Sequence, residues 1–110
     1  MRTITIEKDF SNTPGGRYIK EGPNSGEEFR KNILLPIYKE TIKNGEKLEI
    51  NFDGCYGYAT SFLEEAFGGL VRELKQKGIL ENIVIISMDD ASIPELIEGY
   101  VKEAEESLNM

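Results

Sequence analysis

The sequence predicts an α/β fold in which a mixed sheet of about four strands packs against about three helices. Short apolar or alternating segments take turns along the chain with stretches of helical periodicity, and turn or capping residues mark the boundaries. Alternation of this kind implies crossover connections and hence a largely parallel or mixed sheet. No repeat, linker or low-complexity segment interrupts the 110 residues, so we expect a single domain spanning residues 1–110.

Three segments are predicted strands, and a fourth is a weaker candidate. Residues 3–6 and 48–52 alternate apolar and polar side chains, as expected for strands with one buried face. Residues 83–86 are wholly apolar, which is typical of a strand buried on both faces. Residues 17–19 lie between two loops rich in turn residues and are the candidate for the further strand.

Three amphipathic segments are predicted helices. Ser25 and Glu28 have the spacing of a capping box at the start of the first helix, and Pro36 inside that helix predicts a kink or a break. Thr60 or Ser61 is expected to cap the second helix. The third follows the Ser-Ile-Pro-Glu sequence at 92–95, in which a cap precedes a proline tolerated in the first turn.

Composition restricts the chemistry that the chain can perform. It has 13 basic and 20 acidic residues, a net charge of −7, one Cys and no His. The lack of His excludes Ser-His-Asp and Cys-His relays, and one Cys cannot build a zinc cluster. Asp53, Asp89 and Asp90 are expected near the carboxyl ends of parallel strands, where Mg²⁺ can bind, but no motif supports a metal. We therefore predict no cofactor, no catalytic residues and no enzymatic activity.

The distribution of charge and hydropathy indicates which kinds of partner and which cellular location to expect. Residues 89–110 hold seven acids and one base, and such a segment repels phosphate backbones. It is either a solvated helix face or a docking surface for a basic partner. No apolar run approaches the roughly 20 residues of a membrane span, and the N-terminus has no apolar signal region. We expect a cytoplasmic protein that binds neither nucleic acid nor membrane.

Residues 50–63 are the most informative stretch for function. A strand ends, a loop containing glycine follows, and two hydroxyl residues, Thr60 and Ser61, begin a helix. A helix N-terminus carries free amides and a partial positive charge, so it suits an anion, including a phosphate on its own serine. A simple cap is the alternative explanation. Tyr56 and Tyr58 in the loop belong either to a protein interface or to the core.

This stretch resembles the STAS-type domain of bacterial anti-sigma-factor antagonists. Those proteins have an apolar-Asp-apolar-Ser-Gly strand followed by Asp-Ser-Ser-Gly-Leu at a helix start, and Ile50–Gly54 and Ala59–Leu63 occupy the corresponding places here. Ser61 falls on the residue that a partner kinase phosphorylates in the antagonists. Ala59 and Phe62 stand where the motif has an acid and a glycine.

The chain is more similar still to the STAS-like domains of otherwise unassigned function. Those relatives show a Ser-Phe pair followed by acids at this helix, and Ser61-Phe62-Leu63-Glu64-Glu65 fits that pattern. They also tend to carry a Gly-Arg turn and a Ser-Gly-x-x-Phe-Arg helix start, which match Gly16-Arg17 and the segment from Ser25 to Arg30.

The resemblance implies a non-catalytic regulatory module for signalling. It would act by partner switching, in which it binds an ATPase or kinase of the anti-sigma type. Ser61, or Thr60 beside it, is then the candidate phosphorylation site. The partner-binding residues are then expected to be Asp53, Tyr56, Tyr58, Phe62, Glu64 and Glu65.

An alternative is a small-molecule domain that binds a nucleotide or another anion. The Gly- and Arg-rich N-terminal loops offer backbone amides and guanidinium groups, and Arg17, Ser25 and Arg30 are the candidate anion-binding residues. The sequence leaves open which partner is bound and whether the chain acts alone, as a homodimer or beside a companion protein.

Overall fold

The computed structural model describes residues 1–108 and contains one sheet of three strands in the order β1-β2-β3. Both pairings are parallel, and Ile50 on the central strand lies opposite Ile4 on one side and Ile85 on the other. The sheet is therefore parallel rather than mixed. The strands are β1 (Arg2–Thr5), β2 (Leu48–Asn51) and β3 (Ile83–Ile86).

The fourth strand expected at residues 17–19 is absent from the described part of the chain. Ile19–Glu21 form a 3-10 turn, η1, instead. The Glu21 carboxylate accepts hydrogen bonds from the amides of Arg17 and Tyr18 at 3.1 and 2.8 Å. Because a side chain satisfies these amides, the segment needs no neighbouring strand.

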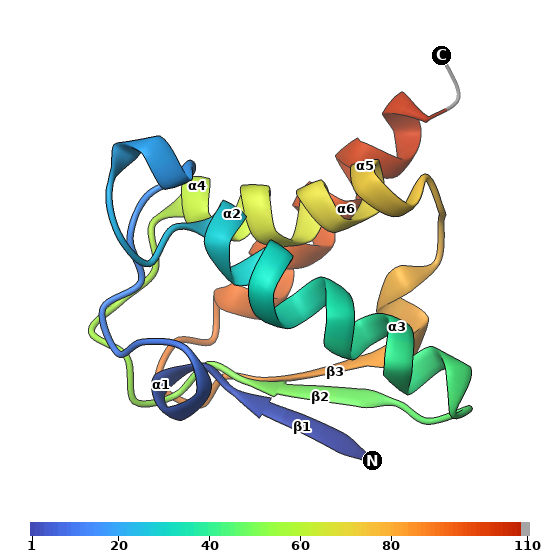
Figure 1. Ribbon diagram of the computed structural model, residues 1–110, viewed down its shortest axis with the longest axis horizontal. Coiled ribbons are helices and arrows are strands. Elements are labelled where there is room, and N and C mark those ends of the chain that lie inside the picture. Colours follow the sequence, from blue (N-terminus) through green and yellow to red (C-terminus); the bar gives the residue numbers. More distant parts are fainter. Residues whose placement is uncertain (109–110) are drawn as a thin grey trace.

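Three continuous helical segments cover one face of the sheet, in agreement with the predicted number (Figure 1). A short helix and a 3-10 turn lie outside these segments at the ends of strands. The first segment comprises α2 (Gly26–Phe29), the π-helical turn η2 (Arg30–Leu34) and α3 (Leu35–Lys43); the second comprises α4 (Thr60–Leu63), the π-helical turn η3 (Glu64–Gly68) and α5 (Gly69–Leu74); the third is α6 (Ile93–Ser107); the short elements are α1 (Ile6–Asp9) and η4 (Ile79–Asn82).

Pro36 lies in the first segment without breaking it. It occupies the first turn of α3, directly after η2, where the Leu35 amide bonds to the Arg30 carbonyl five residues back. A proline cannot donate to the carbonyl four residues before it, and a wider turn just upstream accommodates the missing bond. The predicted break is therefore absent, and a π-helical turn lies just upstream of the proline.

The first helix cap is predicted correctly and the second is not. The Ser25 hydroxyl accepts the Glu28 amide at 3.0 Å, and the Glu28 carboxylate accepts the amide of Asn24. At the second segment, however, Ala59 is the N-cap residue, and neither Thr60 nor Ser61 makes a side-chain capping bond. The two hydroxyls lie inside the first turn, one and two positions after the cap.

The core fills the space between the helices and the inner face of the sheet. Ile4 and Ile50 are fully buried there, and the rings of Phe29 and Phe62 pack 5.8 Å apart between the first two helical segments. In β3 only Ile83 is buried, so the prediction of a strand buried on both faces is wrong. β3 is an edge strand, and its apolar side chains are shared between a covered and an uncovered face of the sheet.

We expect Phe62→Ala to lower the free energy of unfolding by about 3–5 kcal/mol, because it removes a fully buried ring and leaves a cavity between two helices. Tyr56→Ala, which truncates a side chain that is 87% exposed, should change it by less than about 0.5 kcal/mol. Urea unfolding of both variants measures the difference. Equal stability of the two would contradict the placement of Phe62 in the core.

Candidate functional site

The loops that follow β2 and β3 lie together at the carboxyl ends of the strands (Figure 1, left). Asp53 joins them: its Oδ1 accepts the amides of Met88 and Asp89 at 2.8 and 2.9 Å. In return the Gly54 amide donates to Asp89 Oδ2 at 3.0 Å. These reciprocal bonds fix the two loops relative to each other and make one surface of them.

Two large side chains project from this pair of loops. Tyr56 is 87% exposed and Met88 is 84% exposed. Tyr58 turns the other way, because its hydroxyl donates to the Phe52 carbonyl at 2.8 Å and its ring packs 5.9 Å from that of Phe62. Of the two tyrosines in the loop, one therefore lies on the surface and the other against the core.

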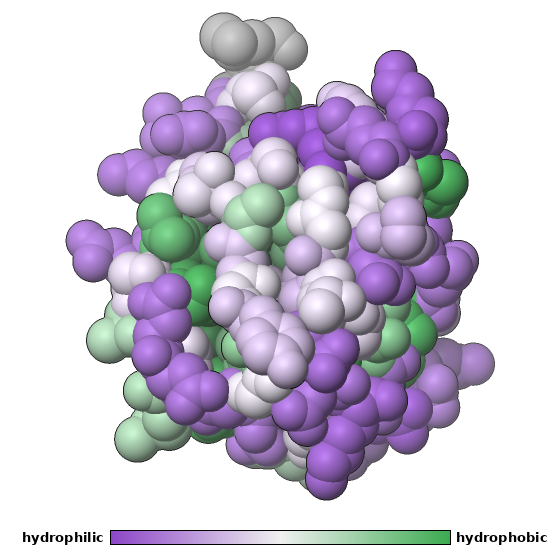
Figure 2. All heavy atoms as spheres, turned by 90° about the vertical axis from the view of Figure 1, so that its left-hand side faces the viewer, coloured by the Kyte–Doolittle hydropathy of each residue, from purple (hydrophilic) through white to green (hydrophobic). Residues whose placement is uncertain are grey.

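We call the surface formed by residues 53–58, 60–61 and 88–90 the contact face. Figure 2 looks onto this end of the molecule and shows weakly polar and apolar side chains in its middle, bordered by hydrophilic ones. A hollow of ≈ 240 Å³ lies here, lined in part by Tyr56, Ser87, Asp89 and Asp90. The hydroxyl and the amide of Ser92 donate to Asp90 Oδ1 and lower the pKa of that carboxyl, so the hollow has an acidic border.

Cys55 is not activated as a nucleophile. Burial raises the pKa of its thiol, and the pKa of the Tyr58 hydroxyl 3.0 Å away is raised by burial as well. Both groups are therefore protonated at neutral pH.

The predicted hydroxyl pair lies at the border of the contact face. Thr60 is exposed, Ser61 is half-buried, and Phe62 is fully buried. The expectation that Phe62 contacts a partner is corrected, because its ring packs in the core against Phe29 and Tyr58.

A network of arginines and glutamates joins the N-terminal loop and the first two helical segments. At its centre, Arg30 and Glu65 form an ion pair of 2.7 Å, and each is only 7% exposed. Arg30 also donates to the Glu65 carbonyl at 2.5 Å and to the Glu73 carboxylate at 3.1 Å. Gly69 lies beside the Arg30 guanidinium, where a Cβ atom would collide with it. The missing side chain thus makes room for the buried charge.

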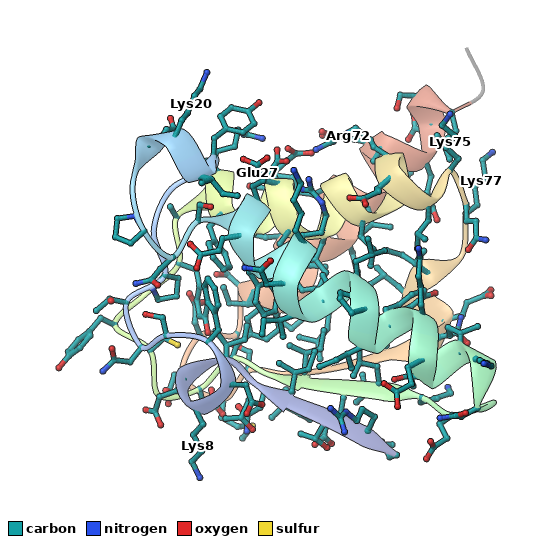
Figure 3. All side chains as sticks on the ribbon, in the orientation of Figure 1. Lys8, Lys20, Glu27, Arg72, Lys75 and Lys77 are labelled. Carbon is teal, nitrogen blue, oxygen red and sulfur yellow. The ribbon has the colours of Figure 1, made fainter. Side chains whose placement is uncertain are left out.

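Glu64 holds the outer part of the network. Arg17 Nη1 lies 2.5 Å from Glu64 Oε1, and Arg72 Nη1 lies 2.7 Å from Glu64 Oε2. Partial burial by itself raises the pKa of the Glu64 carboxyl, but the hydrogen bonds and charges of Arg72 and Arg17 outweigh it and lower the pKa. In Figure 3 Arg72 lies on the upper side of the molecule, the side on which Glu27 also lies.

The groups predicted to bind an anion are occupied by the chain's own carboxylates. Arg17 and Arg30 are paired with Glu64 and Glu65, and Ser25 is fully buried as a helix cap. Glu21 takes the loop amides of residues 17 and 18, and Glu27 takes that of residue 19 at 2.9 Å. The same pairing turns Glu64 and Glu65 toward the arginines, although the sequence placed them among the partner contacts.

A second hollow, of ≈ 540 Å³, lies beside this loop and is lined by Tyr18, Ile19, Lys20 and Glu27. Lys20 projects away from the body of the molecule (Figure 3), with its Nζ 5.6 Å from the centre of the Tyr18 ring. None of the three predicted anion-binding residues is among the residues that line this hollow.

The three aspartates considered for Mg²⁺ are engaged otherwise. Asp53 and Asp89 accept hydrogen bonds from backbone amides of each other's loops, and Asp90 accepts the amide of Ser92 in its own loop. Within residues 1–108, no group of three or more His, Cys, Asp or Glu side chains is arranged to hold a metal ion. None of the helices in this range is long and apolar enough to cross a membrane.

Comparison with known proteins adds one finding. A family model described as a STAS-like domain of unknown function (DUF4325) matches residues 25–92. The matched range runs from the cap of α2 through β3 and includes the contact face and the Arg30–Glu65 pair, but not Arg17. Searches of curated proteins and of solved structures found no match.

We expect Arg30→Met to lower the free energy of unfolding by about 3–5 kcal/mol, because it leaves the buried Glu65 carboxylate without its nearest cation. Lys31→Met is the matched control, since it breaks only the surface pair of Lys31 with Glu27 and should cost about 0.5 kcal/mol or less. Urea unfolding compares the two. Similar losses in the free energy of unfolding would contradict the larger contribution expected of the buried pair.

The network also predicts a dependence of stability on pH. Because the folded-state pKa of Glu64 lies below the ordinary value of 4.5, its pairing stabilises the fold above that pH and is lost as the pH falls through the folded-state pKa. We expect Glu64→Gln to flatten the acid limb of a plot of melting temperature against pH. Glu98→Gln, which removes an exposed carboxyl on α6, should leave that limb unchanged.

Proposed function

The chain belongs to the STAS-like family, and from this premise we propose that it is a non-catalytic regulatory module that binds a protein partner through the contact face. The observation that carries the proposal is the pair of exposed side chains, Tyr56 and Met88, on two loops that Asp53 holds together. Exposed aromatic and methionine side chains on a fixed support are suited to anchor a protein interface.

The chemistry of the face describes the partner that would fit it. Tyr56 and Met88 offer apolar anchors, and Asp89 and Asp90 border the hollow beside them. We therefore propose a partner with an apolar pocket and nearby basic residues. The family resemblance suggests an ATPase or kinase of the anti-sigma type.

Control by phosphorylation is part of the same proposal. Thr60 and Ser61 occupy the first turn of a helical segment that runs to Leu74, and Thr60 is the more exposed of the two. A phosphate would add about −1.5 to −2 charges at the border of an already acidic face. It would open the interface because a phosphate loses its hydration when it is brought against the apolar pocket that receives Tyr56 and Met88, while the helix N-terminus tolerates the charge in the free protein.

Site-specific photo-crosslinking tests the contact face. We expect a photoreactive phenylalanine analogue at position 56 to capture an anti-sigma-type ATPase when both proteins are present in the native cells. The same analogue at Ile42, which is 39% exposed on α3, should not capture it. Capture from position 42 alone would place the interface on the first helical segment and contradict the proposal.

Phosphorylation is tested on the same complex. Replacing Thr60 and Ser61 together by Asp should weaken the captured complex at least tenfold, whereas replacing both by Ala should leave its affinity within twofold. Indistinguishable affinities for the wild type, the Asp form and the Ala form would contradict the switch and leave the contact face standing.

A further inference from the structure

The two edge strands of the sheet differ in how their outer backbone groups are satisfied. Successive residues of a strand direct their N–H and C=O groups to opposite sides. In β1 the Arg2 amide donates to the Lys47 carbonyl, so Arg2 faces the centre of the sheet and Thr3 and Thr5 face outward. The Thr5 amide donates to the Asp9 carboxylate at 2.8 Å. The chain's own side chain thus closes part of this edge.

The outer edge of β3 is open. The Ile86 carbonyl accepts the Phe52 amide at 2.8 Å, so Val84 and Ile86 face β2, and Ile83 and Ile85 direct their backbone groups outward. The Ile83 amide is used within η4. Within residues 1–108, the carbonyls of Ile83 and Ile85 accept no hydrogen bond and the Ile85 amide donates none.

The side chains of β3 do nothing to protect this edge. The strand reads Ile-Val-Ile-Ile and carries no charge, proline or glycine, the features that usually keep an edge strand from pairing. Ile85 shares an inward-facing row with Ile4 and Ile50, which are fully buried, yet Ile85 is only half-buried. The helical layer therefore stops short of this edge, and an added strand would cover the exposed part of Ile85.

The charge around β3 indicates which kind of strand would be added. Glu81 precedes β3 and Asp89 and Asp90 follow it, and the 24 residues between Lys77 and Lys102 contain five acids and no Lys or Arg. A second copy of the chain, with its net charge of −7, would bring the same acids to the edge and be repelled. A segment with basic residues on either side of an apolar stretch would be attracted. The acids are Glu81, Asp89, Asp90, Glu95 and Glu98.

We propose that β3 accepts an extended apolar segment of a partner protein, flanked by Lys or Arg, as a fourth strand of the sheet. Main-chain hydrogen bonds to Ile83 and Ile85 would supply the affinity, and the acids around the strand would select the basic flanks. This surface borders the contact face at Asp89 and Asp90 but does not use Tyr56 or Met88, and the inference does not depend on the function proposed for that face.

Amide hydrogen exchange, followed by NMR on the full chain, tests the proposal with a synthetic probe. The probe is a decapeptide that alternates valine and threonine between flanking lysines, and the control peptide replaces the lysines by glutamates. In the free protein the Ile85 amide should exchange faster than those of Val84 and Ile86. The lysine peptide should slow exchange at Ile85 at least tenfold and bind at least tenfold more tightly than the glutamate peptide.

Variants separate the two edges. Ile85→Pro removes the outward N–H and should weaken the lysine peptide at least tenfold, whereas Thr3→Pro, at an outward position of β1, should leave its affinity within twofold. If Ile85→Pro does not fold, Val84→Lys replaces it, since a lysine on this edge should also weaken the peptide at least tenfold. Tyr56→Ala should bind the peptide as the wild type does, which keeps this test independent of the contact face.

Three results would overturn the proposal. One is unchanged exchange at Ile85 when the lysine peptide is present in large excess. Another is equal binding of the lysine and glutamate peptides. The third is protection of Ile85 that rises with protein concentration without any peptide, because a second copy of the chain would then occupy the edge.

Discussion

A buried ion pair between Arg30 and Glu65 determines how the first two helical segments meet. The pair needs Gly69 to make room for the guanidinium, and Gly26 to let the start of α2 approach the Phe62 carbonyl, where a Cβ atom would come within 2.5 Å. Moving two charges out of water is costly, and replacing such a pair by apolar side chains is often no loss in stability. The pair joins the two segments at one register, and at that register Glu64 lies within reach of Arg17 and Arg72.

The same network determines whether the N-terminal loop can bind an external anion. Its arginines and its amides are satisfied by carboxylates from the chain itself, so an external phosphate would have to displace Glu64, Glu65, Glu21 or Glu27. The carboxyl ends of the strands are different. There Asp53 and Asp89 fasten two loops to each other and leave Tyr56 and Met88 pointing outward. The arginine–glutamate pairs therefore disfavour an anion site in the N-terminal loop. The hydrogen bonds that join the loops after β2 and β3 favour a protein interface at the strand ends.

The alternation of strands and helices, the three helical segments and the Ser25 cap could be predicted from sequence because they depend on local periodicity and capping. The Arg30–Glu65 pair could not be predicted, because its members lie 35 residues apart. Judged from its neighbours in sequence, Arg30 is a candidate anion ligand and Glu65 is a candidate partner contact. The position of Phe62 at the start of the second helix predicts a partner contact, but tertiary packing against Phe29 and Tyr58 decides its burial. The wholly apolar sequence of β3 predicts a strand covered on both faces, whereas β3 is an edge strand with only Ile83 buried. Composition cannot distinguish a strand covered on both faces from an edge strand that lacks cover on one side.

A partner bound at the carboxyl ends of the strands would protect different backbone amides from one bound at the arginine-containing loop. Hydrogen–deuterium exchange of the chain, alone and in complex with a protein partner isolated from its native cells, distinguishes the two most directly. We expect slowed exchange in residues 53–61 and 87–90 and little change in residues 15–30, because the contact face and not the loop receives the partner. Protection confined to residues 15–30, with residues 53–61 unaffected, would contradict this expectation.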